Sequence, residues 1–180
     1  MSGAPEFRVV GLECYERPVR LRLPFRFGVV TLSAAPQALV RARIRLADGT
    51  EGWGMAAEML VPKWFDKNPA LGNEDNLDQL RRALWLAREQ YLQATPRSAF
   101  GHFAAHYREQ LTGGAARGLN PLVASFGPAL LDRAVLDALC RVTGKSFFAA
   151  ITENLVGLAP QALLPEFQGF DMDGFLANLS

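Results

Sequence analysis

The segment 37–58, with the sequence QALVRARIRLADGTEGWGMAAE, constrains the fold more than any other stretch of this chain. Across 40–46 apolar residues alternate with arginines, a period of two that is typical of a strand with one buried and one solvent-facing side. Asp48-Gly49 follows and favours a tight hairpin turn, after which the returning strand carries glycine at positions 52 and 54. A strand that lacks these side chains indicates that another backbone, a large side chain or a ligand lies against that face.

Size and charge restrict the class of protein. A chain of 180 residues fits one domain of ordinary size. Its 19 Lys and Arg against 18 Asp and Glu give a net charge of +1, so neither nucleic acid nor a membrane is expected as a partner. Cys14 and Cys140 stand far apart in apolar patterns, which indicates reduced thiols and a cytoplasmic location. No apolar run approaches the roughly 18 residues of a membrane span, and no signal-peptide core is present.

Two segments bounded by prolines flank the hairpin. Strand patterns cover 7–15 and 19–23, and the parity of their apolar residues changes at Pro18, which predicts a bulge or a strand break there. The segment 24–36 then predicts a long connection between strands, which either presents Arg26 for binding or is anchored by buried phenylalanines. The segment 59–72, with two prolines and a Trp-Phe pair, predicts a second ordered loop.

Helical periodicity begins at Asn73. The first helix carries a leucine stripe with Asn76 and Gln79 as a capping box, and a second, capped by Ser98, carries an apolar stripe formed by Phe103, Tyr107 and Leu111.

The most apolar helix of the chain is expected at the centre of the fold. It begins at Asn120-Pro121 and ends at Thr143 before Gly144. Ser146 caps a further short helix, and the last twenty residues predict one more, preceded by capping aspartates.

The chemical signals are weak. His102 and His106 have metal-ligand spacing, but Phe103 stands where a zinc protease has its glutamate, so surface or partner-facing histidines are favoured over a metal site. Asp132 and Asp137 lie about 140° apart on a helix, too far round to share a substrate, and we expect partial exposure and an Asp137–Arg141 ion pair. These patterns indicate binding loops without catalytic or metal-binding residues.

The order of elements, with ADGTEGWG at 47–54 and ALLDRAVLDALCRVTGK at 129–145, resembles the N-terminal capping domain of the enolase superfamily, in the muconate lactonizing enzyme and mandelate racemase branch. The resemblance covers about residues 7–158. It implies an α+β fold in which a three-stranded antiparallel meander (about 6–58) precedes a bundle of three to four helices (about 74–155). Residues 1–158 would form the cap, and 159–180 would lead into a (β/α)-barrel that is absent from this chain.

The resemblance also implies a function. In that family the cap closes over a barrel that holds Mg²⁺ and the catalytic bases, and a racemase, dehydratase or cycloisomerase removes a proton beside a carboxylate through a metal-stabilised enediolate. This chain would be the substrate-capping part, inactive alone, with no cofactor of its own and Mg²⁺ in the complete enzyme. The implied substrate-binding residues are Phe25, Arg26, Phe27, Gly28 and Thr31 in the first loop, and Trp53, Met55 and Glu58 in the second.

Within this set Arg26 would face the carboxylate of a small-molecule substrate. Met55 stands where family members often have glutamate, and the segment after Lys145 lacks their usual Pro and Gly-Gly. The alternative is a standalone binding or assembly module whose exposed apolar face meets a partner or a second copy. A metal-dependent enzyme built on His102 and His106 is a third, weaker interpretation.

Overall fold

A computed structural model describes residues 3–27 and 30–179, with only the backbone of Phe27 and Val30. Three strands form one antiparallel sheet in the order β1 (Phe7–Phe27), β2 (Val30–Leu46) and β3 (Glu51–Met59). The helices that follow in the described ranges are α1 (Pro62–Phe65), α2 (Asn73–Gln93), α3 (Ala99–Ala115), α4 (Pro121–Thr143), α5 (Phe147–Thr152) and α6 (Met172–Ala177). The predicted α+β class, a meander followed by helices, is confirmed.

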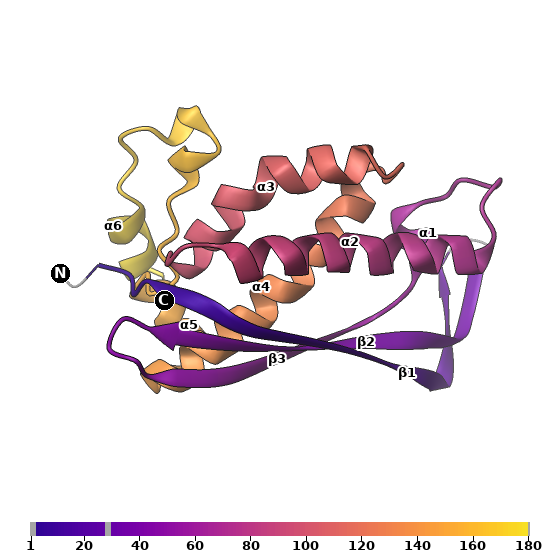
Figure 1. The fold of residues 1–180 in the computed structure, drawn as a ribbon, viewed down its shortest axis with the longest axis horizontal. Helices are drawn as coiled ribbons and strands as arrows, with labels where there is room; N and C mark the ends of the chain where they lie inside the picture. Colours follow the sequence, from indigo (N-terminus) through magenta and orange to yellow (C-terminus); the bar gives the residue numbers. More distant parts are fainter. Residues whose placement is uncertain (1–2, 28–29, 180) are drawn as a thin grey trace.

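The three long helices lie together on one side of the sheet (Figure 1). Among them α4 contacts β2, β3, α2 and α3, as its apolar circumference predicts. The Asn120 side chain accepts the Val123 N–H at 2.9 Å, and Gly144 ends the helix at φ 65°. Leu130, Leu131 and Leu139 of α4 are fully buried between these elements.

The glycines of β3 let the backbone of α4 approach the sheet. A Cβ on Gly54 would overlap Ala134 O and Ala138 N, and one on Gly52 would overlap the Val142 side chain. Of the three alternatives that the sequence left open for this face, the structure shows another backbone at Gly54 and a side chain at Gly52. Since β3 is an edge strand, its Met55 N–H faces outward, where Asp137 Oδ2 accepts it at 2.8 Å.

The predicted strand break at Pro18 is wrong. Pairing shifts instead between Val9 and Gly11, and this bulge keeps Phe7, Val9 and Leu12 buried although their parity changes. Pro18 lies in register opposite Pro36. A pair of residues that exchanges no hydrogen bonds needs neither N–H, so both prolines fit within the paired strands.

The predicted long connection over 24–36 is also wrong, because β1 continues to Phe27 and β2 begins at Val30. Arg20 still pairs with Ala34, and Phe25 with Leu32. We call residues 17–27 and 30–36 the arm. It is a two-stranded extension beyond the part of the sheet that includes β3, whose pairing with β2 ends at Gln37 and Met59.

Two helix details differ from the sequence expectation. Helix α2 begins after Gly72, whose N–H donates to Asp75 Oδ2 at 3.0 Å, while Asn76 and Gln79 are buried and bond each other at 3.1 Å. On α3 the buried residues are His102, Gln110 and Gly114, whereas Tyr107 of the predicted apolar stripe is exposed.

The histidines of α3 are not surface residues. His102 is fully buried, with Nε2 3.0 Å from Phe7 O, and burial lowers its pKa. His106 is partly buried, and its ring lies 5.8 Å from that of Tyr91. Because a backbone carbonyl satisfies one imidazole nitrogen of His102, a polar residue can occupy this core position.

The C-terminal residues form short elements. Two 3₁₀ turns (Pro160–Ala162 and Pro165–Phe167) precede α6, where Asp171 accepts the Gly174 N–H at 2.9 Å as predicted for a cap. Asn154 Nδ2 donates to Asp173 Oδ1 at 2.6 Å, which ties α6 to the residues after α5. The division between a cap ending at 158 and a lead-in from 159 remains a prediction. No helix in the described ranges is both long and apolar enough to cross a membrane.

Candidate functional site

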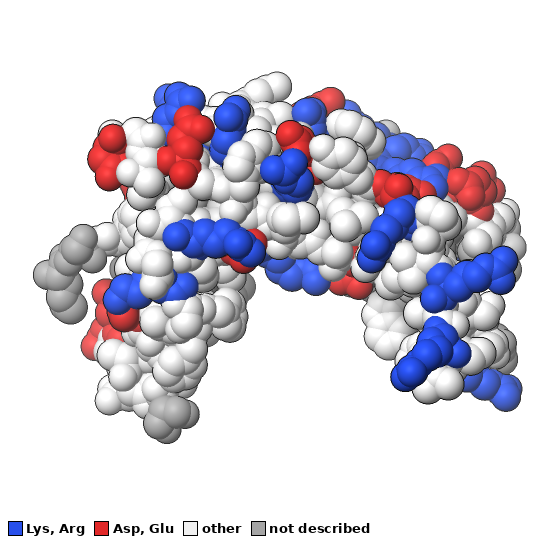
Figure 2. Space-filling view, turned by 90° about the horizontal axis from the view of Figure 1, so that it is seen from below, with Lys and Arg blue, Asp and Glu red and all other residues white. Residues whose placement is uncertain are grey.

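The arm is the most exposed and the most basic part of the sheet. Residues 17–36 include four arginines and no aspartate or glutamate. Near its end Phe25 pairs with Leu32 and Arg26 with Thr31, and Phe25 is 55% exposed. Figure 2 shows a hollowed face between two projections, and Lys and Arg side chains predominate on the projection at the end of the molecule that carries the arm. The first predicted loop is therefore a cationic hairpin with apolar side chains.

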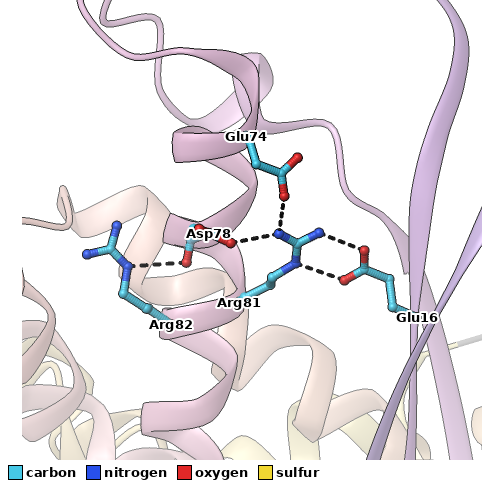
Figure 3. A network of polar contacts seen from close by, with 5 residues as sticks. All are labelled: Glu16, Glu74, Asp78, Arg81 and Arg82. Carbon is cyan, nitrogen blue, oxygen red and sulfur yellow. Dashed lines mark hydrogen bonds and ion pairs between the residues drawn. The ribbon is translucent and has the colours of Figure 1, made fainter.

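A single arginine of α2 fixes the strand where the arm begins (Figure 3). Arg81 Nη2 and Nε donate to the two carboxylate oxygens of Glu16 on β1 at 2.7 and 2.9 Å. Its Nη1 also donates to Glu74 at 2.6 Å and to Asp78 at 2.7 Å. The hydrogen bonds between Arg81 and Glu16 hold the pKa of Glu16 below its ordinary value. The bidentate geometry defines the direction of β1 at this point.

The second proline-bounded segment lies beside the base of the arm. A groove of about 90 Å³ separates them, lined by Leu32, Ala35 and Pro36 of β2 and by Leu60, Pro62 and Lys63 of the other segment. Lys63 Nζ donates to the carbonyls of Asn68 and Leu71, both at 3.2 Å, and so orders the chain between α1 and α2. The two segments that the sequence predicted to flank the sheet thus meet at one end of the molecule.

Trp53 and Met55 lie on the outer face of the sheet, away from the end of the arm. Trp53 pairs with Arg43, and the guanidinium carbons of Arg41 and Arg43 lie 4.4 and 5.3 Å from its ring centroid. Ala42, which neighbours both arginines, is separated from Leu32 by ten residues of β2, about 33 Å along an extended strand. This indole therefore forms cation–π contacts within the sheet.

Glu58 occupies the opposite face of β3. Its carboxylate accepts a hydrogen bond from Arg133 Nη2 on α4 at 2.9 Å. Because strand residues alternate in direction, Glu58 and Trp53 point to different sides of the sheet. The structure therefore brings Phe25, Arg26 and Thr31 together and separates them from Trp53, Met55 and Glu58.

The remaining predicted residues are Phe27, of which the backbone alone is described, and Gly28, which lies outside the described residues. At this end of the molecule the structure also places two residues of α1 that were not in the predicted set, Lys63 and Trp64. The Trp64 side chain is 62% exposed. The Trp-Phe pair between two prolines was the available signal. Phe65 packs edge-on against Phe126 with ring centroids 5.4 Å apart, so of this pair Phe65 is the anchor and Trp64 faces outward.

The arm combines cationic and apolar side chains. Residues 17–36 include no Asp, Glu, His or Cys that could transfer a proton or act as a nucleophile. In the described part of the chain no three His, Cys, Asp or Glu side chains gather to hold a metal ion. Arginines beside apolar side chains suit a small molecule with a carboxylate and an apolar part.

No family model matches this chain, and no curated protein matches it in sequence. Solved structures match its fold. An enolase from an alphaproteobacterium, BAL199, with bound Mg, has a TM-score of 0.52 at 15% identity, over 79% of this chain and 33% of that chain. A mandelate racemase/muconate lactonizing enzyme from Bordetella bronchiseptica has a TM-score of 0.48 at 20% identity, over 81% of this chain and 33% of that chain. A dipeptide epimerase from Methylococcus capsulatus, complexed with Mg and the dipeptide L-Arg-D-Lys, has a TM-score of 0.47 at 19% identity, over 80% of this chain and 34% of that chain.

The chain thus spans about a third of the length of the structures that it matches. The fold assignment rests on the first of them, which has the highest TM-score of the three. Together with the meander and the helices that follow it, this similarity shows that the chain has the fold of the enolase-type N-terminal capping domain, as the sequence predicted.

Proposed function

We propose that this chain is the substrate-capping N-terminal domain of an enzyme of the enolase superfamily, in the muconate lactonizing enzyme and mandelate racemase branch. The observation that carries the proposal is that the arm and the α1 segment meet at one end of an enolase-type cap and present cations and aromatic side chains there. Residues 1–158 form the cap in this proposal, and 159–180 lead toward a barrel domain.

In the complete enzyme the arm binds and encloses the substrate. Arg26 donates to its carboxylate, while Phe25 and Trp64 exclude water around its apolar part. Thr31, opposite Arg26, adds a hydroxyl. Phe27 and Gly28 remain predicted contact residues of the same hairpin. Trp53, Met55 and Glu58 are retained as the second contact segment, although in the described structure they lie apart from the arm.

The barrel supplies the chemistry. It removes a proton beside the carboxylate in a racemase, dehydratase or cycloisomerase reaction, and its Mg²⁺ offsets the negative charge that develops on the substrate. Because no described residues of the cap gather as metal ligands, the proposal assigns the metal to the barrel. The cap contributes binding, orientation and exclusion of water.

The first test is the coding sequence that follows codon 180. The proposal expects an in-frame barrel with spaced acidic ligands and a Lys-x-Lys pair of bases. In that complete enzyme Arg26→Ala should raise KM at least about tenfold, because a charge-assisted hydrogen bond to the substrate is lost. The melting temperature should shift by less than about 2 °C, since Arg26 lies at the exposed end of the arm.

Arg108→Ala is the matched control, because Arg108 is exposed on α3 and should leave KM unchanged. An unchanged KM together with a large loss of melting temperature for Arg26→Ala would contradict the proposed role of the arm.

A standalone binding or assembly module is the second candidate. The observation that favours it is the exposed aromatic cluster of the C-terminal segment, where Phe170 is 48% and Phe175 52% exposed with ring centroids 5.8 Å apart. This candidate expects no downstream barrel and a homo-oligomer in solution. Sedimentation of the purified chain, combined with the gene sequence, separates the two.

A further inference from the structure

One carboxyl group of α4 lies inside the helical layer, far from the arm. Asp132 Oδ1 accepts a hydrogen bond from Tyr91 Oη on α2 at 2.5 Å. Tyr91 is fully buried, and its ring lies 5.9 Å from that of His102 and 5.8 Å from that of His106, both on α3. The hydrogen bond from this packed phenol therefore fixes the orientation of the Asp132 carboxyl group.

A cavity of about 290 Å³ opens beside this carboxyl group. Most of its wall is formed by Phe100 and Phe103 of α3, Leu136 of α4, Ile151 of α5 and Leu158. Of the described residues that line it, Asp132 is the one that is ionisable. The volume lies just below the usual range for ligand sites, about 300–1,000 Å³, which suits a molecule of one ring and a short chain.

The second carboxylate oxygen of Asp132 has no hydrogen-bond donor among the described residues, whereas the first is held by Tyr91. Burial raises the pKa of Asp132 to about 7. Among the described residues, Tyr91 of α2 is the titratable group that hydrogen-bonds to it, and the rings of His102 and His106 on α3 pack against the Tyr91 ring. The described residues of α5 and of the segment after it that line the cavity, Ile151, Val156 and Leu158, are all apolar.

We propose that this cavity is a binding site for a small amphiphilic ammonium ion, with the apolar part of the ligand among Phe100, Phe103 and Leu136 and the ammonium group on Asp132. Among the described residues no Lys or Arg lines the cavity, so an anion would meet a carboxylate and no cation there. A neutral apolar ligand would cover the second Asp132 oxygen without giving it a donor, which is unfavourable. An ammonium group supplies that donor, and aromatic faces favour a cation nearby.

The site is separate from the arm, and the inference does not depend on the proposed capping function. Asp137, five residues further along α4, points to β3, where it accepts the Met55 N–H. It therefore offers a matched acidic residue on the same helix outside the cavity.

The test is a titration of the 180-residue chain with 2-phenylethylammonium and with 2-phenylethanol, followed by heteronuclear NMR and calorimetry. At pH 8.5 Asp132 is ionised, whereas an alkyl ammonium keeps its proton because its pKa is near that of lysine. The ammonium should bind at least about tenfold more tightly than the alcohol. At pH 5.5 protonation of Asp132 should weaken ammonium binding roughly thirtyfold, with no effect on the alcohol.

Three variants complete the test. Asp132→Asn keeps an acceptor for Tyr91 and should abolish the preference for the ammonium, while Asp137→Asn, which changes the net charge equally, should bind like the unmodified chain. Ala99→Phe places a ring in the cavity and should block both ligands, which keeps the test decisive if Asp132→Asn does not fold. Equal binding of ammonium and alcohol, unchanged binding by Asp132→Asn, or no binding at about 20 mM would overturn the proposal.

Discussion

The arm and the contact between β3 and α4 belong to one sheet, yet different forces hold them. Where β3 crosses α4, Gly54 lets the helix backbone touch the strand, and the neighbouring Val40, Ala42 and Ile44 of β2 have no exposed surface. In the arm, Leu23 is 73% and Phe25 55% exposed. Two-stranded hairpins are marginally stable alone, so the arm depends on the sheet that continues from it. Stability is concentrated in the first region, and side chains available for contact in the second.

The largest expected effect is at the contact between β3 and α4. Gly54→Val should lower the free energy of unfolding by about 3 kcal/mol or more, because its side chain would overlap the α4 backbone at Ala134 and Ala138. Urea unfolding monitored by circular dichroism measures the loss. Gly11→Ala is the control, since its Cβ would meet Arg43 Cβ at an ordinary 3.4 Å. Equal effects of the two substitutions would break the comparison.

The next effect concerns pH. The pKa of Asp132 is about 7 in the folded chain and about 3.9 in an unfolded one, so the folded state binds more protons between these values. Stability should therefore fall as pH rises from about 4 to 7. Asp132→Asn should remove this slope and be more stable than the unmodified chain at pH 8, by at most about 4 kcal/mol, the linkage energy of a shift of about three pKa units. Thermal unfolding across pH measures it, and a slope that persists in Asp132→Asn would exclude this residue as its source.

A smaller effect is expected where the arm joins the body of the molecule. Arg81→Met removes the bidentate contact with Glu16 and should cost about 1 kcal/mol, a loss that shrinks at high salt. The contribution should be present at neutral pH and disappear as pH falls through the lowered pKa of Glu16. Arg82→Met is the control, because within the described part of the chain Arg82 makes one hydrogen bond, to the carbonyl of Asp78 at 3.3 Å. If both variants unfold at the same urea concentration, Arg81 does not hold the arm.

The smallest effect is expected at the arm itself. Leu23→Ser should change the free energy of unfolding by less than about 0.5 kcal/mol, since the side chain is 73% exposed. If the exposed apolar side chains of the arm drive association, the same change should lower the sedimentation-average mass at high concentration. A destabilisation comparable to that of Gly54→Val would show that the arm is part of the core.

Much of the fold could be predicted because local signals and packing agree. The Asp48-Gly49 turn, the Asn120 cap and the αL Gly144 each act within a few residues, and the alternation across 40–46 fixes one buried face. The extent of the arm could not be predicted in this way. Prolines ordinarily interrupt strands, but Pro18 and Pro36 face each other in a two-stranded region where neither N–H is needed.

Polar core residues of α3 escaped prediction for a similar reason. Gln110 Nε2 donates to the carbonyls of Ala83 at 3.1 Å and Ala124 at 2.8 Å, so the helix turns this polar face inward. Such partners come from distant elements and leave no local pattern. For the candidate site, Arg26 and Phe25 were predicted from residue type and from the family resemblance. The separation of Trp53 from Glu58 follows from strand alternation and appears with the register of β3.

The Asp137 carboxylate on the outward N–H of Met55 has a consequence for assembly in the cell. A strand edge with open hydrogen-bonding groups invites a strand of a neighbouring molecule, and this contact closes β3 to such growth near its middle. On the other edge, Pro18 and Pro24 withhold two amide hydrogens from β1. Both edges of the sheet therefore disfavour the strand pairing that leads to fibrils, so association of this chain is expected through its side-chain surfaces.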